Sequence, residues 1–279
     1  MYMYDYHTHS RNSSDGKNSA AALCEKAIAA GMREIAVTDH FEPTTGNEEY
    51  RFYKPCNYFL DMLKARMLYG TQLKIKYAVE LGQPHLYPEY SARLLESYPY
   101  DYVLASAHKM KGDVDFGEVA YDKNNLSQYC VSYLEELKAL ALWNNFDCVG
   151  HLDLIKRYAA RVDLKANLME HRERLEEVLK ILIGNGKGIE INTSGLRQHA
   201  KECLPGLDIV RLYKQLGGEI ITVGSDAHCS EDVGKGIREG IEIARTAGFE
   251  YMTVYTQRKP HRIRLTEKAS AAAIVKKPA

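Results

Sequence analysis

The sequence predicts a closed or nearly closed barrel of seven parallel β-strands that alternate with α-helices. Short apolar runs alternate with amphipathic stretches along the 279 residues, a pattern typical of parallel strands joined by helical crossovers. Six of the ten histidines also stand where an apolar run stops. In a parallel barrel all C-terminal strand ends meet at one face, which would bring these side chains together. Seven strand–helix units are more than most open sheets with a single crevice contain, so a barrel is favoured over an open sheet.

The individual elements follow from the same patterns. Strands are expected near residues 3–7, 34–38, 74–79, 101–106, 147–150, 188–192 and 219–224, with a further extended run at 252–255 as an edge or closing element. Ser19 is expected to cap a helix that ends at Gly31. Further helices are expected from Tyr58 onward and over 126–143, 168–183 and 234–247. No linker or fixed-period repeat interrupts the chain, so residues 1–268 are expected to form one domain, followed by a flexible tail over 269–279.

Charge and composition narrow the class of protein. Lys plus Arg equals Asp plus Glu at 37 each, so there is no basic excess of the kind that nucleic-acid or membrane-surface binding needs. No apolar stretch approaches the length of a membrane span, and the N-terminus lacks the pattern of a signal peptide. The six cysteines form no CxxC pair and are expected to be reduced and mostly buried. We therefore expect a cytoplasmic enzyme with a small-molecule substrate; the oligomeric state is not indicated.

Histidines and acids recur at the predicted strand ends. His7 and His9 lie two residues apart, so an extended backbone places both imidazoles on the same side. Glu80 follows a strongly apolar run, where a charge is costly unless it is paired or ligates a metal. Any one such residue could be a hydrogen-bonded core residue, and Asp15 alone could be a turn aspartate. The repetition instead indicates a metal centre, with candidate ligands His7, His9, Asp15, His40, Glu80, His108, His151, Asp226 and His228.

The donor set constrains the metals. Nitrogen and carboxylate ligands without thiolate suit divalent zinc first, with manganese or iron as alternatives. Nine ligands exceed what one ion uses, so two or three ions are expected, with Glu80 as a bridge. Paired ions about 3.5–4 Å apart generate a hydroxide and clamp the oxygens of a displacement at phosphorus, which predicts hydrolysis. His171 is expected on the surface of a charged helix. The four remaining histidines are expected to be non-ligands: His85, His171, His199 and His261.

The same residues resemble the motifs of the polymerase and histidinol phosphatase (PHP) family of metal-dependent phosphoesterases. The matching motifs are His7-Thr8-His9 with Asp15, Thr38-Asp39-His40, Ser106-Ala107-His108 and Ser225-Asp226-Ala227-His228, with Glu80 and His151 between them. The resemblance implies a distorted (β/α)7 TIM-like barrel with the metal site at the C-terminal strand ends. It also implies three ligand sets: His7, His9, Glu80 and Asp226; Glu80, His108 and His151; and Asp15, His40 and His228.

Within the family, the sequence most resembles the monofunctional enzymes that hydrolyse L-histidinol phosphate in histidine biosynthesis. This implies attack by a metal-bridging hydroxide, with Asp226 or His228 as the acid that protonates the leaving alkoxide. Arg197 is expected to hold the phosphate, with Lys156, Arg157 and Tyr158 as further contacts, and Glu42 to contact the organic half. Two alternatives stay open: a phosphoesterase of the same fold acting on nucleotides or DNA ends, and a metal-binding regulatory module without activity.

Overall fold

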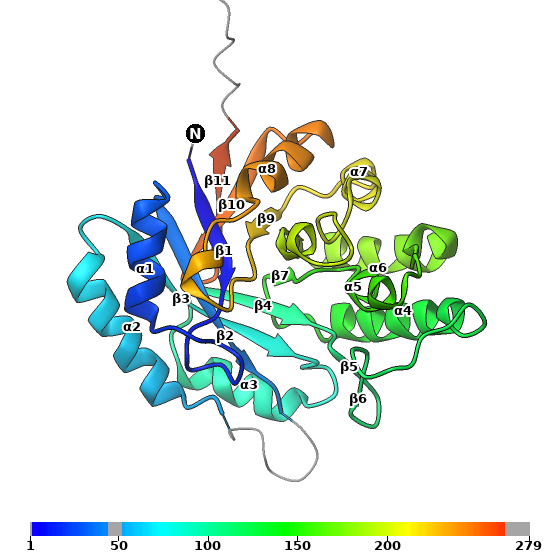
Figure 1. Cartoon of the computed structure of the whole chain (residues 1–279), viewed down its shortest axis with the longest axis horizontal. Helices are drawn as coiled ribbons and strands as arrows, with labels where there is room; N and C mark the ends of the chain where they lie inside the picture. The colour runs from blue at the N-terminus through cyan, green and yellow to red at the C-terminus, as the bar shows by residue number, and fades with distance from the viewer. Residues whose placement is uncertain (1, 44–51, 266–279) are drawn as a thin grey trace, which may run out of the picture.

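Seven parallel strands form the centre of the molecule. The structure, a computed structural model, describes residues 2–43 and 52–265 (Figure 1). In one sheet the strands follow the order β1-β2-β3-β4-β7-β8-β9, and every neighbouring pair is parallel. Their bounds are Tyr4–Thr8 (β1), Glu34–Phe41 (β2), Lys74–Gly82 (β3), Tyr102–Ser106 (β4), Cys148–Val149 (β7), Gly188–Asn192 (β8) and Ile221–Gly224 (β9).

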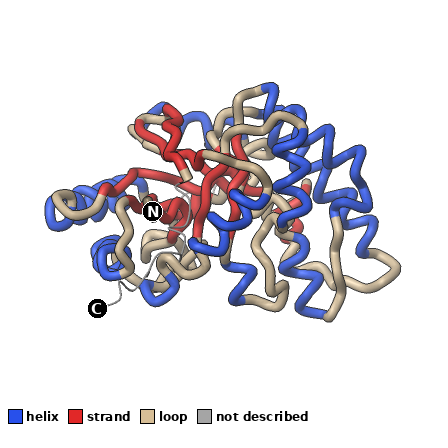
Figure 2. Tube along the Cα trace, turned by 90° about the horizontal axis from the view of Figure 1, so that it is seen from above, coloured by secondary structure: helices blue, strands red, loops and turns tan. Residues whose placement is uncertain are grey.

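The sheet closes at the C-terminal ends of its first and last strands. Thr8 forms a parallel bridge with Ala227 just beyond β9. The His9 amide donates to the Ala227 carbonyl at 2.8 Å, and the Asp226 amide donates to the His7 carbonyl at 2.8 Å. Seen from above, the strands gather in the middle of the molecule with helices around them (Figure 2). The predicted distorted (β/α)7 barrel is therefore confirmed.

Helices join the strands and cover the barrel. They are α1 (Ala20–Ala29), α2 (Pro55–Tyr69), α3 (Pro88–Ser97), α4 (Leu126–Trp143), α5 (Ile155–Ala159), α6 (Arg172–Gly184), α7 (Leu207–Gln215) and α8 (Ile237–Thr246). The Ser19 hydroxyl caps α1 by accepting the Ala22 amide at 3.3 Å, as predicted. The helix expected over 168–183 is divided: a 3₁₀ turn, Leu168–His171, precedes α6, so His171 stands at a helix start.

One sequence prediction about the late extended run was wrong. Residues 252–255 lie in β10 (Tyr251–Thr256), which pairs antiparallel with β11 (Lys259–Arg264) in a separate sheet. The run therefore neither closes nor edges the barrel, because β1 and β9 already meet each other. A second small hairpin, β5 (Lys109–Met110) with β6 (Val114–Asp115), follows β4 and was not predicted.

Buried tyrosines pack beneath the barrel, away from the strand ends that carry the candidate ligands. The ring centroids of Tyr6 and Tyr102 lie 5.0 Å apart, as do those of Tyr102 and Tyr255. The Tyr6 hydroxyl donates to Glu34 on β2 and accepts the Tyr255 amide at 2.8 Å. The hairpin of β10 and β11 is thereby fixed to the barrel, and the C-terminal face is left for the site.

Other sequence expectations concern the thiols, the membrane and the tail. All six cysteines are free, and five are at least partly buried, with Cys56 exposed. Among the described residues, no helix combines the length and apolar character that crossing a bilayer requires. The tail predicted over 269–279 lies outside the described residues.

Candidate metal centre

Four candidate ligands face one another at the centre of the barrel mouth. His7 Nε2 lies 3.0 Å from Glu80 Oε2 and 3.6 Å from Asp226 Oδ1. His9 Nε2 lies 3.4 Å from each of the same two oxygens. All four residues are buried, so their polar atoms face each other and not the bulk solvent. The first of the three implied ligand sets is therefore assembled in the structure.

Glu80 extends this group toward the strands on its other side. Its second oxygen, Oε1, lies 3.1 Å from His151 Nε2 and 3.3 Å from His108 Nε2, and accepts the Ser106 hydroxyl at 2.6 Å. The two carboxylate oxygens of Glu80 thus face different groups of imidazoles. A carboxylate in this position can bridge two cations, as the sequence predicted for Glu80.

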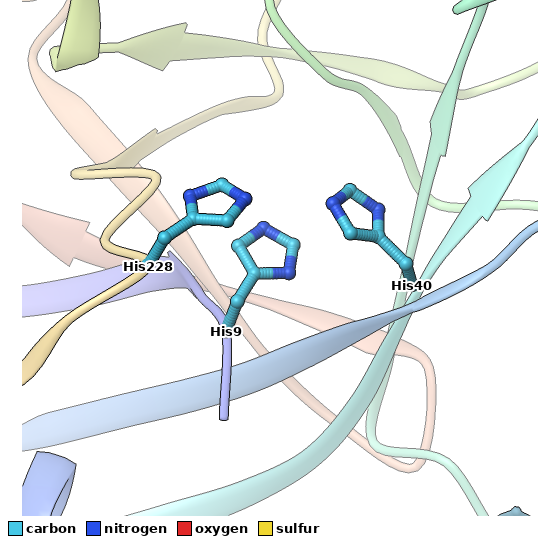
Figure 3. A group of neighbouring side chains, drawn as sticks. All are labelled: His9, His40 and His228. Carbon is cyan, nitrogen blue, oxygen red and sulfur yellow. The ribbon is translucent and has the colours of Figure 1, made fainter. Parts of the chain in front are cut away.

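The third implied set lies at the outer rim of the mouth. His228 Nε2 is 3.0 Å from Asp15 Oδ2, and His40 Nε2 is 3.8 Å from Asp15 Oδ1. The rings of His40 and His228 both stack on His9, with centroids 4.2 Å away in each case, and Figure 3 shows the three imidazoles turned toward a common space. Asp15 is the most exposed of the nine, with a side chain 54% accessible. All nine predicted ligands therefore converge.

Two of these residues have unusual backbone conformations. His151 has a φ of 25° and Asp226 a φ of 53°, in the left-handed region that side chains with a Cβ rarely adopt. Each lies two residues beyond the end of a barrel strand, where the turn directs its side chain into the mouth. Such conformations cost about 1–3 kcal/mol each and cluster at functional sites.

Buried carboxylates around the ligands hold the loops in place. Asp39, next to His40, accepts the Ser10 amide and the Ser10 and Ser13 hydroxyls at 2.6–2.7 Å. Asp5 on β1 accepts the amide and hydroxyl of Ser225, beside Asp226, at 2.8 and 2.5 Å. Sequence reasoning assigned no role to these acids, although each interrupts an apolar run, where an unpaired charge is costly.

The electrostatics of the cluster favour charged acids and some neutral imidazoles. Burial would raise the pKa of Glu80, but the imidazoles of His7 and His40 outweigh it and hold the pKa well below its usual range. Asp226 behaves in the same way, with burial opposed by His7 and Arg157. Burial lowers the pKa of His9, and its histidine neighbours lower it further, so its imidazole is neutral at pH 7. Ionised carboxylates and neutral imidazoles are the forms that bind metals.

The donor atoms fit divalent cations. The distances of 3.0–3.6 Å among His7, His9, Glu80 and Asp226 match the roughly 3.3 Å edges of a tetrahedron with zinc–ligand bonds of about 2.0–2.1 Å. Buried His9 Nε2 and His40 Nδ1 make no hydrogen bond, which is costly unless a cation takes their lone pairs. The ligand atoms also fall into overlapping groups of three within 4.8 Å. A divalent metal centre therefore suits these residues.

A cavity of about 460 Å³ opens onto the cluster. Arg157, Tyr158 and Glu42, three of the predicted substrate contacts, line it together with six of the candidate ligands. The Arg157 guanidinium donates to Asp226 Oδ2 at 2.7 Å and to the Ser194 hydroxyl at 2.8 Å. Glu42 accepts a hydrogen bond from His108 Nδ1.

Two predicted substrate contacts lie elsewhere. The Arg197 guanidinium donates to the Ser225 carbonyl at 2.8 Å and lines a separate hollow, although Arg157 borders both spaces. Lys156 pairs with Asp153 at 3.0 Å and lines a third depression, because α5 turns it away from the barrel mouth. The structure therefore does not place Arg197 or Lys156 in the lining of the central cavity.

Comparisons with known proteins agree with this arrangement. The model of the PHP domain family matches residues 5–194. A probable histidinol-phosphatase of Thermotoga maritima is 32% identical over 90% of this chain and 95% of its own length. A histidinol-phosphatase of Lactococcus lactis is 28% identical over 93% of this chain and 96% of its own length. A crystal structure of the Lactococcus lactis enzyme with zinc, L-histidinol and phosphate superposes with a TM-score of 0.80 at 26% identity, covering 93% of this chain and 98% of that one.

Proposed function

Because the chain belongs to the PHP domain family, we propose that it is a metal-dependent histidinol-phosphatase, which hydrolyses L-histidinol phosphate to L-histidinol and phosphate. The single observation that carries the proposal is the convergence of nine imidazole and carboxylate side chains beside a cavity of about 460 Å³. Relatives named for this activity match over nearly the whole chain, which supports the same substrate. Residues 1–268 are proposed to act as one domain.

Two or three divalent ions, zinc first, are proposed to occupy the cluster. His7, His9, Glu80 and Asp226 would hold the first, and Glu80 would share the second with His108 and His151. Asp15, His40 and His228 would hold the third. When bound, such ions activate water at neutral pH and neutralise the oxygens of the phosphate.

The protein's own groups orient the phosphate and the leaving group. Arg157 is the cation of the cavity lining that lies nearest the acid cluster, because its guanidinium already contacts Asp226 at 2.7 Å. A planar guanidinium presents further N–H donors to phosphate oxygens while it keeps this contact. His7 and Arg157 hold Asp226 in its ionised form, so Asp226 is poorly suited to donate a proton. His228, which lines the cavity, is the better of the two candidates for protonating the leaving alkoxide, a role open to it only while it does not hold the third ion.

The organic half of the substrate needs an acid for its ammonium and a flat surface for its imidazole. Glu42 is engaged by His108, which leaves less of its charge for a ligand. Asp115 on β6 lines the same cavity, with one oxygen accepting the Gly117 amide at 2.6 Å. The rings of Phe52, Tyr53 and Tyr158 supply the apolar lining. We therefore assign the ammonium contact to Asp115 ahead of Glu42.

Phosphate release from a substrate panel tests this function. Zinc-loaded protein is assayed with histidinol phosphate, a nucleoside monophosphate and a 3′-ended oligonucleotide, and its metal content is measured in parallel. The proposal predicts a kcat/KM for histidinol phosphate at least about a hundredfold above the others, which is roughly 2.7 kcal/mol of transition-state discrimination. Preference for the nucleotide or the oligonucleotide would instead establish the alternative of the same fold. No turnover of any substrate by metal-loaded protein would favour a regulatory module.

A further inference from the structure

A fully buried carboxylate lies directly behind two of the candidate ligands. Glu190 sits on β8 and is 0% exposed. Its Oε1 accepts a hydrogen bond from His7 Nδ1 at 2.8 Å, and its Oε2 accepts the His151 amide at 3.0 Å. Asn192, two residues further along β8, donates its side-chain amide to the same Oε2 at 3.1 Å. Glu190 thereby connects β1 and the turn after β7 to its own strand.

We propose that Glu190 is the positioning residue of the metal centre, which fixes the tautomer and orientation of His7 and the backbone turn that carries His151. This inference rests on the proposed function, in which His7 and His151 are ligands. Glu190 itself does not face the ions, because both of its oxygens are directed at protein donors.

The donors and acceptors around His7 determine its tautomer. A carboxylate only accepts, so His7 Nδ1 must carry the proton that it donates to Oε1. In the neutral imidazole, which is the form that binds a cation, the opposite nitrogen Nε2 then presents its lone pair to the space beside Glu80 and Asp226, 3.0 and 3.6 Å away. A hydrogen bond from the non-ligating nitrogen also raises the basicity of the ligating one.

Glutamate is the residue that meets all three donors. A glutamine at position 190 could take two orientations. If its amide oxygen faced His7, its NH₂ group would face the donors of His151 and Asn192. In the reverse orientation the NH₂ group would face His7 Nδ1 and favour the tautomer with Nε2 protonated, which cannot bind a cation. The first orientation removes two of the three contacts and the second removes one, without changing the size of the side chain.

The fold leaves room for this contact at one glycine. A Cβ at Gly224, the last residue of β9, would lie 2.3 Å from both Glu190 Oε1 and His7 Cβ. A side chain there would push the two residues apart. His151 adds a second constraint, because the hydrogen bond that its backbone amide donates to Glu190 stabilises its φ of 25°. Three elements of the barrel are thus shaped around one carboxylate.

The test measures zinc affinity by competition with a chromophoric chelator in wild type and Glu190→Gln. Removal of such an orienting partner is expected to weaken binding by about 10–100-fold. Glu34→Gln is the matched control: Glu34 is also a buried strand glutamate, 1% exposed, but it binds Tyr2 and Tyr6 at the opposite end of the barrel. Zinc affinity within about threefold of wild type is expected for this control.

The outcomes separate this inference from the proposed function. Zinc affinity of Glu190→Gln within threefold of wild type, or an equal loss in Glu34→Gln, would overturn the role of Glu190 and leave the phosphatase proposal intact. If the wild-type protein binds no zinc, both the role of Glu190 and the phosphatase proposal are wrong. If Glu190→Gln does not fold, ¹⁵N NMR of histidine-labelled, zinc-loaded wild type decides: a protonated Nδ1 on His7 supports the proposal, and an unprotonated Nδ1 contradicts it.

Discussion

Glu80 contacts more of the other candidate ligands than any other single residue does, since its two oxygens face five imidazoles from four strands or strand ends. Oε2 lies 3.0, 3.4 and 3.1 Å from the rings of His7, His9 and His40, and Oε1 faces His108 and His151. A neutral residue in its place leaves those imidazoles without the charge that draws two cations together.

Replacement of Glu80 by glutamine removes the bridging charge at nearly constant volume. We expect kcat/KM for histidinol phosphate to fall at least about a thousandfold, roughly 4 kcal/mol, and bound metal per chain to decrease. Steady-state kinetics and elemental analysis check this. Wild-type turnover in Glu80→Gln would exclude Glu80 from the catalytic centre.

Arg157 and Arg197 are expected to differ in their effect on catalysis. Arg157 lines the cavity and contacts Asp226, whereas Arg197 supports the loop through the Ser225 carbonyl. Arg157→Ala should lower kcat/KM at least about tenfold more than Arg197→Ala does, a difference of about 1.4 kcal/mol. Arg157→Lys, which keeps the charge but not the planar donors, should recover only part of the loss. A larger effect of Arg197→Ala would return the phosphate contact to Arg197.

Asp115 offers a test of substrate recognition. Asp115→Asn should raise KM for histidinol phosphate about tenfold, because the substrate ammonium loses its charged partner. Hydrolysis of p-nitrophenyl phosphate, which has no ammonium, should stay within about twofold of wild type. Equal losses with both substrates would show that Asp115 acts on the centre itself and not on the ammonium.

The candidate ligands could be read from sequence, but their support could not. His7, His40 and Asp226 stand at the ends of apolar runs, and parallel strands must bring such ends together. Glu190 lies in the middle of an apolar strand, and its partner His7 is 183 positions away. The contact between an inward-facing residue of β8 and a residue of β1 depends on how the barrel closes. No local sequence pattern encodes that closure.

At the scale of elements, the strands and long helices were predicted because their periodicity is strong. All seven barrel strands overlap the expected ranges, and α4 matches 126–143. The short helices α3, α5 and α7 were not predicted, since five to ten residues give a weak helical period. The role of β10 was misjudged because an extended run does not reveal its partner, which is β11 and not a barrel strand.

The attachment of the β10–β11 hairpin predicts a stability effect remote from the site. Tyr6→Phe leaves the Tyr255 amide and Glu34 without the hydroxyl that joins them, in a fully buried environment. The free energy of unfolding should fall by about 1–3 kcal/mol in urea titrations. Tyr2 is half-buried and also donates a hydrogen bond to Glu34. Tyr2→Phe should lower the free energy of unfolding by about 1 kcal/mol or less. Equal effects would mean that the hairpin is fixed by packing alone.

At the scale of the whole molecule, the barrel mouth gathers acids and imidazoles that divalent cations can bind together. Ionised Glu80, Asp226 and Asp15 lie among six imidazoles within one opening. Cations that bind there bind the folded chain and not the unfolded one, so they stabilise the fold by mass action. Metal binding and global stability should therefore change together.

Metal removal is expected to lower the melting temperature. At a zinc concentration about 100 times its dissociation constant, binding contributes about 2.7 kcal/mol, which corresponds to roughly 5–10 °C for a chain of this size. Calorimetry of chelator-treated and zinc-restored protein checks this shift. An unchanged melting temperature would indicate that the cluster binds no ion tightly.

Side chains from six of the seven strand ends are proposed to act together as one metal centre for hydrolysis. A zinc titration of metal-free protein, with bound zinc and histidinol phosphate turnover recorded at each point, tests it most directly. We expect no turnover without metal, binding that saturates at two or three zinc ions per chain, and full activity only near saturation. Full activity in metal-free protein, or saturation below one ion per chain, would contradict it.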